Sequence, residues 1–456
     1  MEHSGHHFIA VIGGSVSGSE AALQLAEKGF RVVVFDQMAL PYGKIEDGLP
    51  KWHVKLRDKE ETNIDQKLMH KNIRFVPNIR LGKDIEVNDL VENWGFSAIL
   101  LATGAWCDRP LPIEKIDKYK GKGLIYQNQL IKWFNHCHEP GYDGPLFNMP
   151  DGAAVVGGGL ASIDVIKIIM IKTVQNKLLE RGIAVDLFTM ERGIDRVLDQ
   201  HELTMEDLGL KGATLFYRRT SYDMPLKPYT REDQREKARE VSNKMLGITQ
   251  RKYKFNFEPL SMPEKMIEED GKLKGLAFKR AEVKDGRVIP VEGSEFNFRT
   301  DLVISSIGSL PEPLKGLPFK NSLIETDTND SCRVKGYENV FAIGNAVTGR
   351  GNIAESRLHG RESAHSIMDT HLEWDEEQFK DLLRGLESSV DQQVGSISQH
   401  LKNIDTMPDE VIQRILDKSK ALQIKVGYDC NFPEWKKRKL PIRLENMPGR
   451  LDKSMV

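Results

Sequence analysis

Apolar and polar residues follow a regular order along residues 8–36, FIAVIGGSVSGSEAALQLAEKGFRVVVFD. An apolar run comes first, a turn of glycine and serine follows it, and the next apolar residues recur at the three- and four-residue spacing of a helix. A second apolar run then ends in Asp36. The pattern predicts a strand, a tight turn, a helix and a second strand, in that order.

A similar order of elements begins at residues 151–170, DGAAVVGGGLASIDVIKIIM. Three consecutive glycines separate an apolar run from a helix that we expect to end near Lys177. Residues 181–212 then intervene before the next apolar run, ATLFY, which is followed at once by Arg218 and Arg219. The chain therefore contains two strand-turn-helix units with different residues after the second strand.

Three further stretches indicate how the two units are connected. Residues 96–110, FSAILLATGAWCDRP, and residues 300–313, TDLVISSIGSLPEP, each read as a strand that runs into a turn of small residues. Such a pair is expected where a chain crosses from one nucleotide domain to another and back. Residues 338–369 again predict a strand, a glycine-containing turn and a helix, which would complete the first unit.

These elements predict an α/β fold with two Rossmann-like dinucleotide-binding domains, the second inserted into the first. We expect the first domain to comprise residues 1–106 and 331–370, and the second to comprise residues 107–330. Residues 371–456 would form a mainly helical C-terminal extension.

Within this extension, apolar residues recur every three or four positions over residues 382–404, which predicts an amphipathic helix that Gly385 and Gly395 weaken. Residues 408–423 predict a second short helix. The first helix can either pack on the body of the protein or bind a partner, and packing is the more ordinary outcome. A basic run over residues 434–453 contains seven cationic and three anionic side chains. It can be a solvated tail or a docking patch for an acidic partner.

The composition narrows the classes of function. The chain of 456 residues has a formal net charge of -2, which argues against nonspecific binding of nucleic acid. No apolar stretch reaches the roughly 20 residues needed to span a bilayer. A strand so close to the N-terminus leaves no room for a targeting peptide, so we expect a cytoplasmic protein. The four cysteines form no CxxC pair and no metal-ligand spacing: Cys107, Cys137, Cys332 and Cys430.

The glycine-rich turn of the first unit has the composition of a dinucleotide-binding site. Small residues let main-chain N–H groups at the helix N-terminus approach a pyrophosphate, and Gly13 and Gly18 fit this role. Ser15 replaces the middle glycine of the usual pattern, with Gly14 beside it. Asp36 ends the second strand, where a carboxylate accepts hydrogen bonds from ribose hydroxyls.

The second unit has two arginines where the first has Asp36. A carboxylate there suits a free ribose 2′-hydroxyl, whereas paired guanidinium groups bind a 2′-phosphate through charge-assisted hydrogen bonds. The first site therefore fits FAD and the second fits NADPH. Ser162 stands at the third glycine position of the second turn, where NADP sites often have a small residue other than glycine. Two solvated arginines in a surface turn are the simpler alternative for Arg218 and Arg219.

Together these features resemble the glutathione-reductase-like flavoproteins with two dinucleotide-binding domains, and most closely the adrenodoxin-reductase type of ferredoxin-NADP reductase. The resemblance covers roughly residues 8–370. The stretch LPYGKIEDGLPKWHVKLRD is similar to a loop that lies along the flavin in that family and ends in a histidine, here His53. The stretch IKWFNHCHEP is similar to its tryptophan-aromatic-asparagine segment, and the RR followed by MP in YRRTSYDMP also resembles the small subunit of glutamate synthase.

This resemblance implies FAD contacts from Ser17 and from the main chain of Lys44, and an NADPH contact from Arg109. The closing motif of the family has a tryptophan where this chain has Asn345, and a Gly-Val-Ile-like run where it has residues 352–354. The residues assigned to FAD are Gly13, Gly14, Ser15, Ser17, Gly18, Asp36, Lys44, Gly344, Asn345, Asn352, Ile353 and Ala354. The residues assigned to NADPH are Arg109, Gly157, Gly158, Gly159, Leu160, Ala161, Arg218 and Arg219.

The resemblance also implies a function, that of an FAD-dependent NADPH oxidoreductase that passes electrons to a separate small carrier such as a ferredoxin or flavodoxin. Hydride transfer between stacked rings requires no nucleophile or metal from the protein, although His53 can tune the flavin or only fill space beside Trp52. An electron-input subunit of a larger complex and a nucleotide-binding sensor without turnover are the alternatives. A disulfide reductase is disfavoured because the four cysteines lie far apart.

Overall fold

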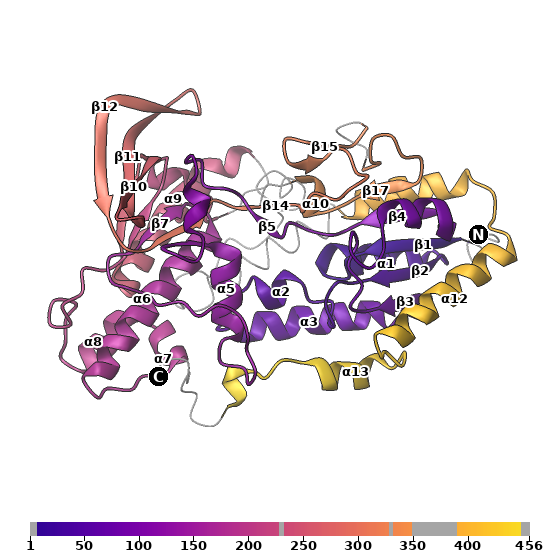
Figure 1. Cartoon of the computed structure of the whole chain (residues 1–456), viewed down its shortest axis with the longest axis horizontal. Coiled ribbons are helices and arrows are strands. Elements are labelled where there is room, and N and C mark those ends of the chain that lie inside the picture. Colours follow the sequence, from indigo (N-terminus) through magenta and orange to yellow (C-terminus); the bar gives the residue numbers. More distant parts are fainter. Residues whose placement is uncertain (1–6, 228–231, 328–331, 349–389, 448–456) are drawn as a thin grey trace.

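The computed structural model describes residues 7–227, 232–327, 332–348 and 390–447. In this part of the chain, two five-stranded parallel sheets lie beside one another, each with helices packed on it (Figure 1). Their central strands are continuous buried apolar runs, as is typical of parallel strands that are covered on both faces. The fold therefore confirms the predicted α/β class with two Rossmann-like domains.

The first sheet contains the first strand-turn-helix unit. Its strands, in sheet order, are β17 (Val340–Ala342), β4 (Ala98–Leu101), β1 (Phe8–Ile12), β2 (Arg31–Phe35) and β3 (Ile73–Val76). The helices of this part are α1 (Val16–Glu27), α2 (Lys44–Asp47), α3 (Val54–Leu68), α4 (Val87–Asp89), a π-helix (Leu90–Trp94) and α10 (Asn345–Thr348). The late strand predicted near residue 340 thus returns to the first sheet, where β17 pairs in parallel with β4.

The second sheet contains the second unit. Its strands, in sheet order, are β6 (Leu124–Tyr126), β13 (Val303–Ser306), β7 (Ala154–Gly157), β8 (Thr214–Phe216) and β9 (Asn256–Glu258). The helices around it are α5 (Gln127–His136), α6 (Leu160–Glu180), α7 (Leu187–Glu191), α8 (Ile194–Gln200) and α9 (Arg235–Tyr253). Shorter elements elsewhere in the chain are the 3-10 helices Ile116–Tyr119, Ser221–Asp223, Glu232–Gln234 and Leu444–Asn446, and the hairpin β15 (Phe319–Lys320) and β16 (Leu323–Ile324).

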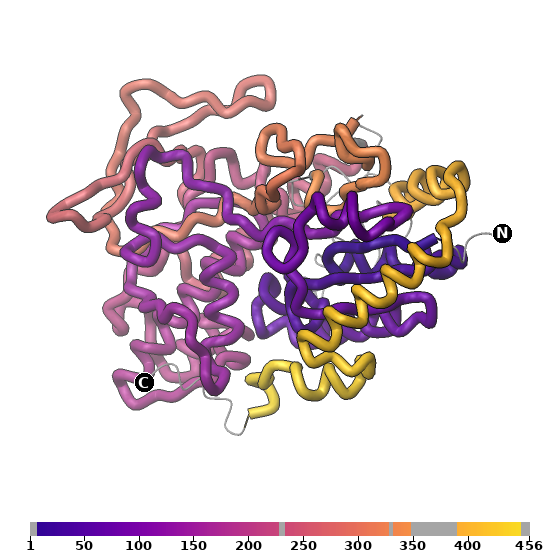
Figure 2. Tube along the Cα trace, turned by 45° about the vertical axis from the view of Figure 1, so that its right-hand side comes forward, coloured from indigo at the N-terminus to yellow at the C-terminus, as the bar shows by residue number. Residues whose placement is uncertain are grey.

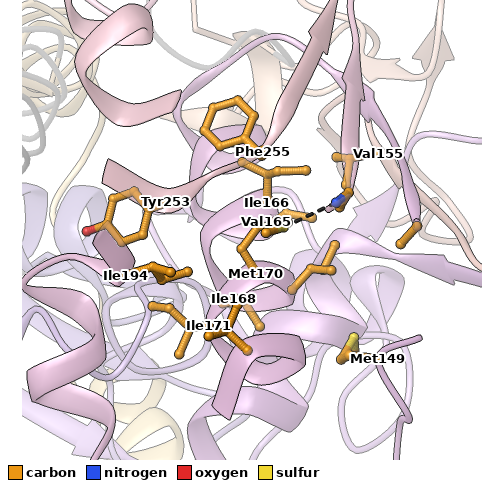
Figure 3. Close-up of a cluster of buried hydrophobic side chains, with 14 of the residues drawn as sticks. Met149, Val155, Val165, Ile166, Ile168, Met170, Ile171, Ile194, Tyr253 and Phe255 are labelled. Atoms are coloured by element: carbon orange, nitrogen blue, oxygen red, sulfur yellow. Dashed lines mark hydrogen bonds between the residues drawn. The ribbon is translucent and has the colours of Figure 1, made fainter. Parts of the chain in front are cut away.

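Helix α6 is buried on almost every side. Its isoleucines and valines pack between the second sheet and the helices α7, α8 and α9 (Figure 3). Met170, near the middle of the helix, accepts a hydrogen bond from the main-chain N–H of Ala213 through its sulfur at 3.2 Å. This packing fixes the N-terminus of α6 at the carboxyl end of β7. Across the described residues, no helix combines the length and the apolar character needed to cross a bilayer.

The two crossover segments lie side by side at the junction of the domains. β5 (Cys107–Asp108) and β14 (Ser309–Leu310) pair in an antiparallel manner, with Cys107 opposite Leu310. The chain thus leaves the first sheet after β4, enters the second, and returns next to its own exit. The crossovers predicted from the two similar sequence stretches are confirmed, while the domain boundaries after residues 106 and 330 stay predictions.

A three-stranded antiparallel meander extends the second domain and was not predicted. It consists of β10 (Ser261–Glu269), β11 (Lys272–Lys284) and β12 (Arg287–Arg299), and it projects from the body of the molecule (Figure 1). Stacking of Phe278 on Phe216, with ring centroids 4.1 Å apart, joins the meander to β8.

The described part of the C-terminal extension, residues 390–447, packs mainly along the first domain (Figure 2). Residues 390–402 are helical, and the apolar residues at 390, 394, 397 and 401 are fully buried against the first sheet. The predicted helix over 382–404 is therefore confirmed for its described part, and it packs on the body of the protein. The second predicted helix is α12 (Asp409–Lys425), and α13 (Phe432–Lys439) follows it.

Residues 440–447, here called the C-terminal strap, continue from α13 to the second domain. The carbonyl oxygen of Ile442 lies 2.9 Å from Nε2 of His138, and Leu444 is buried in the core of the second domain. The strap thus adds a third connection between the two domains, besides the two crossovers.

Candidate functional site

The first glycine turn, between β1 and α1, brings three main-chain segments into contact. Gly13 has a φ of +100°, and a Cβ atom there would lie 2.4 Å from the carbonyl oxygen of Ala102. A Cβ atom at Gly18 would lie 1.7 Å from the carbonyl oxygen of Gly13. Only glycine fits at these two positions. Helix α1 therefore starts directly at the carboxyl end of β1, where a helix N-terminus can receive an anion.

Ser15 shows why this turn accepts serine at its middle glycine position. The residue is the N-cap of α1, and its hydroxyl donates a hydrogen bond to the carbonyl oxygen of Tyr42 at 3.0 Å. Gly43 packs against it, since a Cβ atom at Gly43 would come within 2.8 Å of Ser15 Oγ. The serine therefore ties the turn to the loop before α2.

Asp36 lies at the carboxyl edge of the first sheet, as predicted. Its two carboxylate oxygens accept hydrogen bonds from the main-chain N–H groups of Gly14 at 2.7 Å and Met38 at 2.8 Å. Burial raises the pKa of Asp36 to about 6, and the two N–H groups act in the opposite direction. Because each oxygen keeps a second lone pair, the carboxylate can order the turn and still accept hydrogen bonds from ribose hydroxyls.

A cavity of about 290 Å³ opens at this edge of the sheet. The predicted FAD residues in its wall are Gly13, Ser15, Ser17, Asp36, Lys44 and Asn345. Ala161, from the second glycine turn, and the crossover residues 102–106 line the same cavity. Residues from both glycine turns therefore share one cavity at the junction of the domains.

Three predicted glycines are not part of this wall but directly adjoin its residues in the chain, namely Gly14, Gly18 and Gly344. Gly344 has a φ of +63°, and a Cβ atom there would lie 2.5 Å from Oγ of Ser17. This close approach places the start of α10 against the N-terminus of α1. The remaining residues assigned to FAD, Asn352, Ile353 and Ala354, lie outside the described residues.

The second glycine turn is tightly packed. A Cβ atom at Gly157 would lie 2.2 Å from Oγ of Ser162, which donates a hydrogen bond to the carbonyl oxygen of Ser306 at 2.9 Å. A Cβ atom at Gly158 would lie 2.1 Å from the ring of Tyr217. Gly159 is the N-cap of α6, which starts at Leu160, and it provides no capping side chain. The first N–H groups of α6 are therefore open to an anion, as a phosphate site requires.

Arg218 and Arg219 follow β8 closely, as predicted. Arg218 is exposed, and among the described residues it forms no hydrogen bond or ion pair. Arg219 is half-buried, and its guanidinium donates to the carbonyl oxygen of Gly286 at 2.7 Å. Gly286 lies in the turn between β11 and β12. The meander thus reaches the predicted 2′-phosphate site, which no pattern in the sequence indicated.

Lys44 brings its side chain to the cavity, whereas the resemblance implied only a main-chain contact. Its Nζ donates to Oδ1 of Asn128 and to Oγ of Ser309, both at 3.0 Å. Its main-chain carbonyl accepts the N–H groups of Gly48 and Leu49, each at 3.0 Å.

Arg109 and His53 do not line the cavity. Arg109 is exposed, and its main-chain N–H donates to the carbonyl oxygen of Gly308 at 2.9 Å. His53 is buried at the N-cap of α3, with Nε2 3.8 Å from Oδ1 of Asp164 on α6 and its ring 6.0 Å from that of Trp52. The roles assigned to both residues stay predictions.

Several residues of the cavity wall were missed by the sequence analysis. Arg80 and Glu312 form a bidentate ion pair, with Nη2 of the arginine 2.7 and 2.8 Å from the two carboxylate oxygens. Asn128 lies in the first turn of α5, and Trp106 directly precedes β5 in the first crossover. The position of Trp106 after a predicted strand could have marked it, but no local pattern marks the other three.

Two parallel sheets that are joined by paired crossovers, each with a glycine turn at its carboxyl edge, define a class, the oxidoreductases with two dinucleotide-binding domains. Comparison with known proteins supports this class from the sequence as well. Residues 7–204 match the model of the pyridine nucleotide-disulphide oxidoreductase family.

Several curated proteins are similar over most of this chain. The mitochondrial NADPH:adrenodoxin oxidoreductase of Arabidopsis thaliana is 24% identical, over 68% of this chain and 69% of that protein. The NADP(+)-dependent formate dehydrogenase subunit beta of Moorella thermoacetica is 24% identical, over 79% of this chain but only 43% of that protein. The glutamate synthase [NADPH] small chain of Escherichia coli is 23% identical, over 79% of this chain and 68% of that protein.

Among solved structures, FprA of Mycobacterium tuberculosis in complex with NADPH has the same fold. The TM-score is 0.65 at 18% identity, and the alignment covers 92% of this chain and 91% of FprA. The comparisons confirm the resemblance stated above and the predicted class of enzyme and cofactors. In sequence the chain is thus similar to NADPH-dependent oxidoreductases, and it has the fold of FprA.

Proposed function

We propose that this protein takes a hydride from NADPH onto FAD and passes the electrons to a separate small carrier protein of the ferredoxin or flavodoxin class. One observation supports the first half more than any other. Ala161 of the second glycine turn lines the same cavity as Gly13, Ser17 and Asp36 of the first. Two dinucleotides that are held by these turns would bring their reactive rings to a common place, as hydride transfer requires.

The residues present fit FAD in the first site. The main chain at Gly13 and Gly18 leaves no room for a side chain, which allows a pyrophosphate to approach α1, and Asp36 offers acceptors for a ribose. Bound FAD supplies a ring that accepts a hydride and later releases the electrons. The chain itself binds and orients the two nucleotides and keeps water from the rings.

Contacts between the domains serve this orientation. The side-chain amide of Asn135, on α5, donates to the carbonyl oxygens of Glu46 and Leu49, each at 2.7 Å, and accepts the N–H of Lys51 at 2.9 Å. Three hydrogen bonds from one side chain therefore fix the loop around α2, which carries part of the cavity wall, against the second domain.

A charged pair reinforces this contact. Nε2 of His136 lies 2.9 Å from Oδ1 of Asp47. Burial opposes protonation of His136, but Asp47 and Glu139 outweigh it and raise the pKa of His136 to about 9. At neutral pH the imidazolium therefore binds the carboxylate on α2 across the domain junction.

The second half of the proposal is that the acceptor is a separate protein. All four cysteines are free, so the chain offers no disulfide that could receive the electrons. Among the described residues, no cluster of histidine, cysteine and acidic side chains could hold a metal ion. The Arabidopsis relative is named for a carrier protein, adrenodoxin.

The test is to record the visible absorbance of the purified protein before and after anaerobic addition of NADPH, and then to add an acceptor. We expect a flavin spectrum that bleaches with NADPH and returns when oxidised ferredoxin or flavodoxin is added. If NADPH bleaches the flavin but only ferricyanide reoxidises it, the proposal that electrons pass to a carrier protein would be contradicted. A protein without flavin would contradict the whole proposal.

A second candidate is an electron-input subunit of a larger complex. It is supported by the Moorella and Escherichia coli relatives, whose names describe a subunit and a small chain. Affinity purification from the source cells at native expression level separates the two candidates, because a subunit would come with a stoichiometric partner. A sensor without turnover, the third alternative from the sequence, would bind nucleotides and leave the flavin oxidised.

A further inference from the structure

Lys44 places a positive charge in the wall of the shared cavity. It is the first residue of α2, and its Nζ lies 5.9 Å from the centroid of the Trp106 ring, which also lines the cavity. Both hydrogen-bond partners of Nζ are neutral, Asn128 at the start of α5 and Ser309 in β14. Among the described residues, Lys44 forms no ion pair. The charge is thus held in place without being cancelled by a bound carboxylate.

A network of neutral side chains continues from Lys44 to the second glycine turn. Nε2 of Gln127 donates to Oγ of Ser309 at 3.2 Å, and Oγ of Ser306 donates to Oε1 of Gln127 at 2.7 Å. Oγ of Ser162, in the first turn of α6, lies 3.1 Å from Oγ of Ser306. The ammonium is therefore fixed relative to both nucleotide sites.

Several ionisable groups surround this lysine. Removal of water by the surrounding protein lowers the pKa of Lys44 to about 8, while Asp108, Asp47 and Cys107 act in the opposite direction. Asp47 lies on α2 and is engaged by His136, and Asp108 lies on β5, where its Oδ1 accepts the N–H of Asn128. An incompletely compensated cation in a cavity has an energetic cost, and such groups gather at functional sites.

Hydride transfer makes use of such a cation. The C4–H bond of the dihydronicotinamide breaks, an N5–H bond forms on the flavin, and both electrons move with the hydrogen, so the flavin ring gains one negative charge without a proton from the protein. A fixed cation stabilises that charge more strongly in a cavity than in water. We propose that the ammonium of Lys44 offsets the charge of the reduced flavin and thereby raises the reduction potential of bound FAD. This inference rests on the proposed function, because it requires FAD in this cavity.

The experiment compares the holoproteins of the wild type, Lys44→Met, Lys44→Arg and the control Lys55→Met. Lys55 is exposed on α3 and outside the cavity wall, so its replacement removes the same net charge from a different place. The potential of the bound flavin is measured against reference dyes at pH 7 and pH 10 by visible absorbance, without turnover.

At pH 7 we expect Lys44→Met to lower the equilibrium constant for flavin reduction about tenfold, which is about 30 mV for a two-electron couple. Lys44→Arg and Lys55→Met should keep the wild-type potential. At pH 10 the lysine has lost its proton, so the wild type should approach Lys44→Met, while the always charged arginine variant should have the higher potential.

Three outcomes would overturn the inference. If the wild type and Lys44→Met both bind FAD and have the same flavin reduction potential at pH 7, Lys44 does not have the proposed role, while the proposed function is unaffected. Equal losses in the Met and Arg variants would mean that Lys44 only positions Asn128 and Ser309. A wild type without FAD would remove the inference and the proposed function together. If Lys44→Met does not retain FAD, the comparison of Lys44→Arg with the wild type at pH 10 decides.

Discussion

Asp36 and Arg218 occupy similar places after β2 and β8, and we expect each of them to select a nucleotide. Asp36 is buried, and both of its oxygens are held by main-chain N–H groups. Arg218 is exposed and, within the described part of the chain, its guanidinium has no hydrogen-bond partner. The first residue therefore has a fixed carboxylate, whereas the second has a guanidinium that can reorient toward a phosphate.

This contrast predicts a cofactor preference that depends on the arginines. Each charge-assisted bond to a 2′-phosphate contributes on the order of 1.5–3 kcal/mol, so Arg218→Ala should raise the KM for NADPH about tenfold to a hundredfold. The KM for NADH should change little, because NADH lacks the phosphate. Steady-state kinetics with both nucleotides and ferricyanide as acceptor measure this. Arg299→Ala is the control, since its ion pair with Glu269 lies at the opposite end of the meander.

Arg219→Ala should have a second effect, because Arg219 also holds the carbonyl oxygen of Gly286. Its KM for NADPH should rise as in Arg218→Ala, and the β11–β12 turn should become more accessible to protease. Equal losses with NADPH and NADH in both variants would mean that the arginines serve the fold and not the 2′-phosphate.

The residues that could be assigned from the sequence are those whose role is set locally. Gly13, Gly18 and Asp36 occupy fixed places in one strand-turn-helix unit, and the structure puts them at the same edge of the sheet. The side-chain hydrogen bonds of Lys44 and the bond from Arg219 could not be predicted. Both depend on partners that are more than 60 positions away in the chain, brought near only by the crossovers and the meander.

The same distinction holds for whole elements. The βαβ units and the crossovers were predicted because each is a continuous apolar run next to small residues. The meander β10–β12 was not, because its apolar alternation is interrupted. The pairing of β11 with β12 shifts register between Lys279 and Ala281. The pairing of β10 with β11 shifts register between Pro263 and Lys265. Each shift moves the following side chains to the other face, which hides a period of two.

The C-terminal strap is another element that local patterns do not reveal. Arg443 is 9% exposed, and it binds Glu46 at 2.5 Å and Glu61 at 2.6 Å. Burial raises the pKa of Glu61 to about 7, with Arg443 opposing this effect and Glu46 adding to it. Two carboxylates of the first domain therefore depend on a cation from the last segment of the chain.

Loss of that cation should weaken the fold in a pH-dependent manner. Arg443→Gln should lower the free energy of unfolding by roughly 3 kcal/mol at pH 8, since it leaves Glu46 and Glu61 facing each other with only the more distant Arg57, 3.8 Å from Glu61, to offset their charge. The loss should be smaller at pH 5, because a carboxyl group with a raised pKa takes up a proton below that value and the repulsion disappears. Urea unfolding at both pH values measures the difference.

The matched control for the strap is Arg438→Gln. Arg438 pairs with Asp429, but both side chains are more than half exposed, so the expected loss is below about 1 kcal/mol at either pH. If Arg443→Gln were no more destabilising than this control, the ion pairs of the strap would contribute little to the stability of the fold.

At the scale of the whole molecule, the question is how a carrier protein finds the flavin. Small electron carriers are usually acidic, and a protein with a net charge of -2 exerts no long-range attraction on them. A local basic patch is then required, and the sequence favours the basic run near the C-terminus over the stretch TREDQREKARE, where acidic residues are interleaved with the basic ones. The structure shows that Lys436 binds Asp65 at 2.5 Å and that Arg443, in the strap, binds Glu46.

Arg450 and Lys453 of this run lie outside the described residues, and the other remaining cations have little free charge to offer. Lys437 pairs with Glu434 at 2.6 Å and Arg438 with Asp429 at 3.1 Å, while Lys439 lies 4.9 Å from the centroid of the Trp435 ring. The two ion pairs are nearly neutral when viewed from beyond about 8–10 Å at physiological ionic strength, whereas the contact of Lys439 with a neutral ring leaves its charge in place. We therefore expect a variant with Lys437, Arg438 and Lys439 changed to serine to keep ferredoxin or flavodoxin reduction within about threefold of the wild type at low salt, with ferricyanide reduction unchanged. Rates at rising salt measure this, because a docking patch would give the wild type a steep salt dependence that the variant lacks. A more than tenfold loss with the carrier alone would show that α13 is the docking surface, and that its acidic partners give way when the carrier binds.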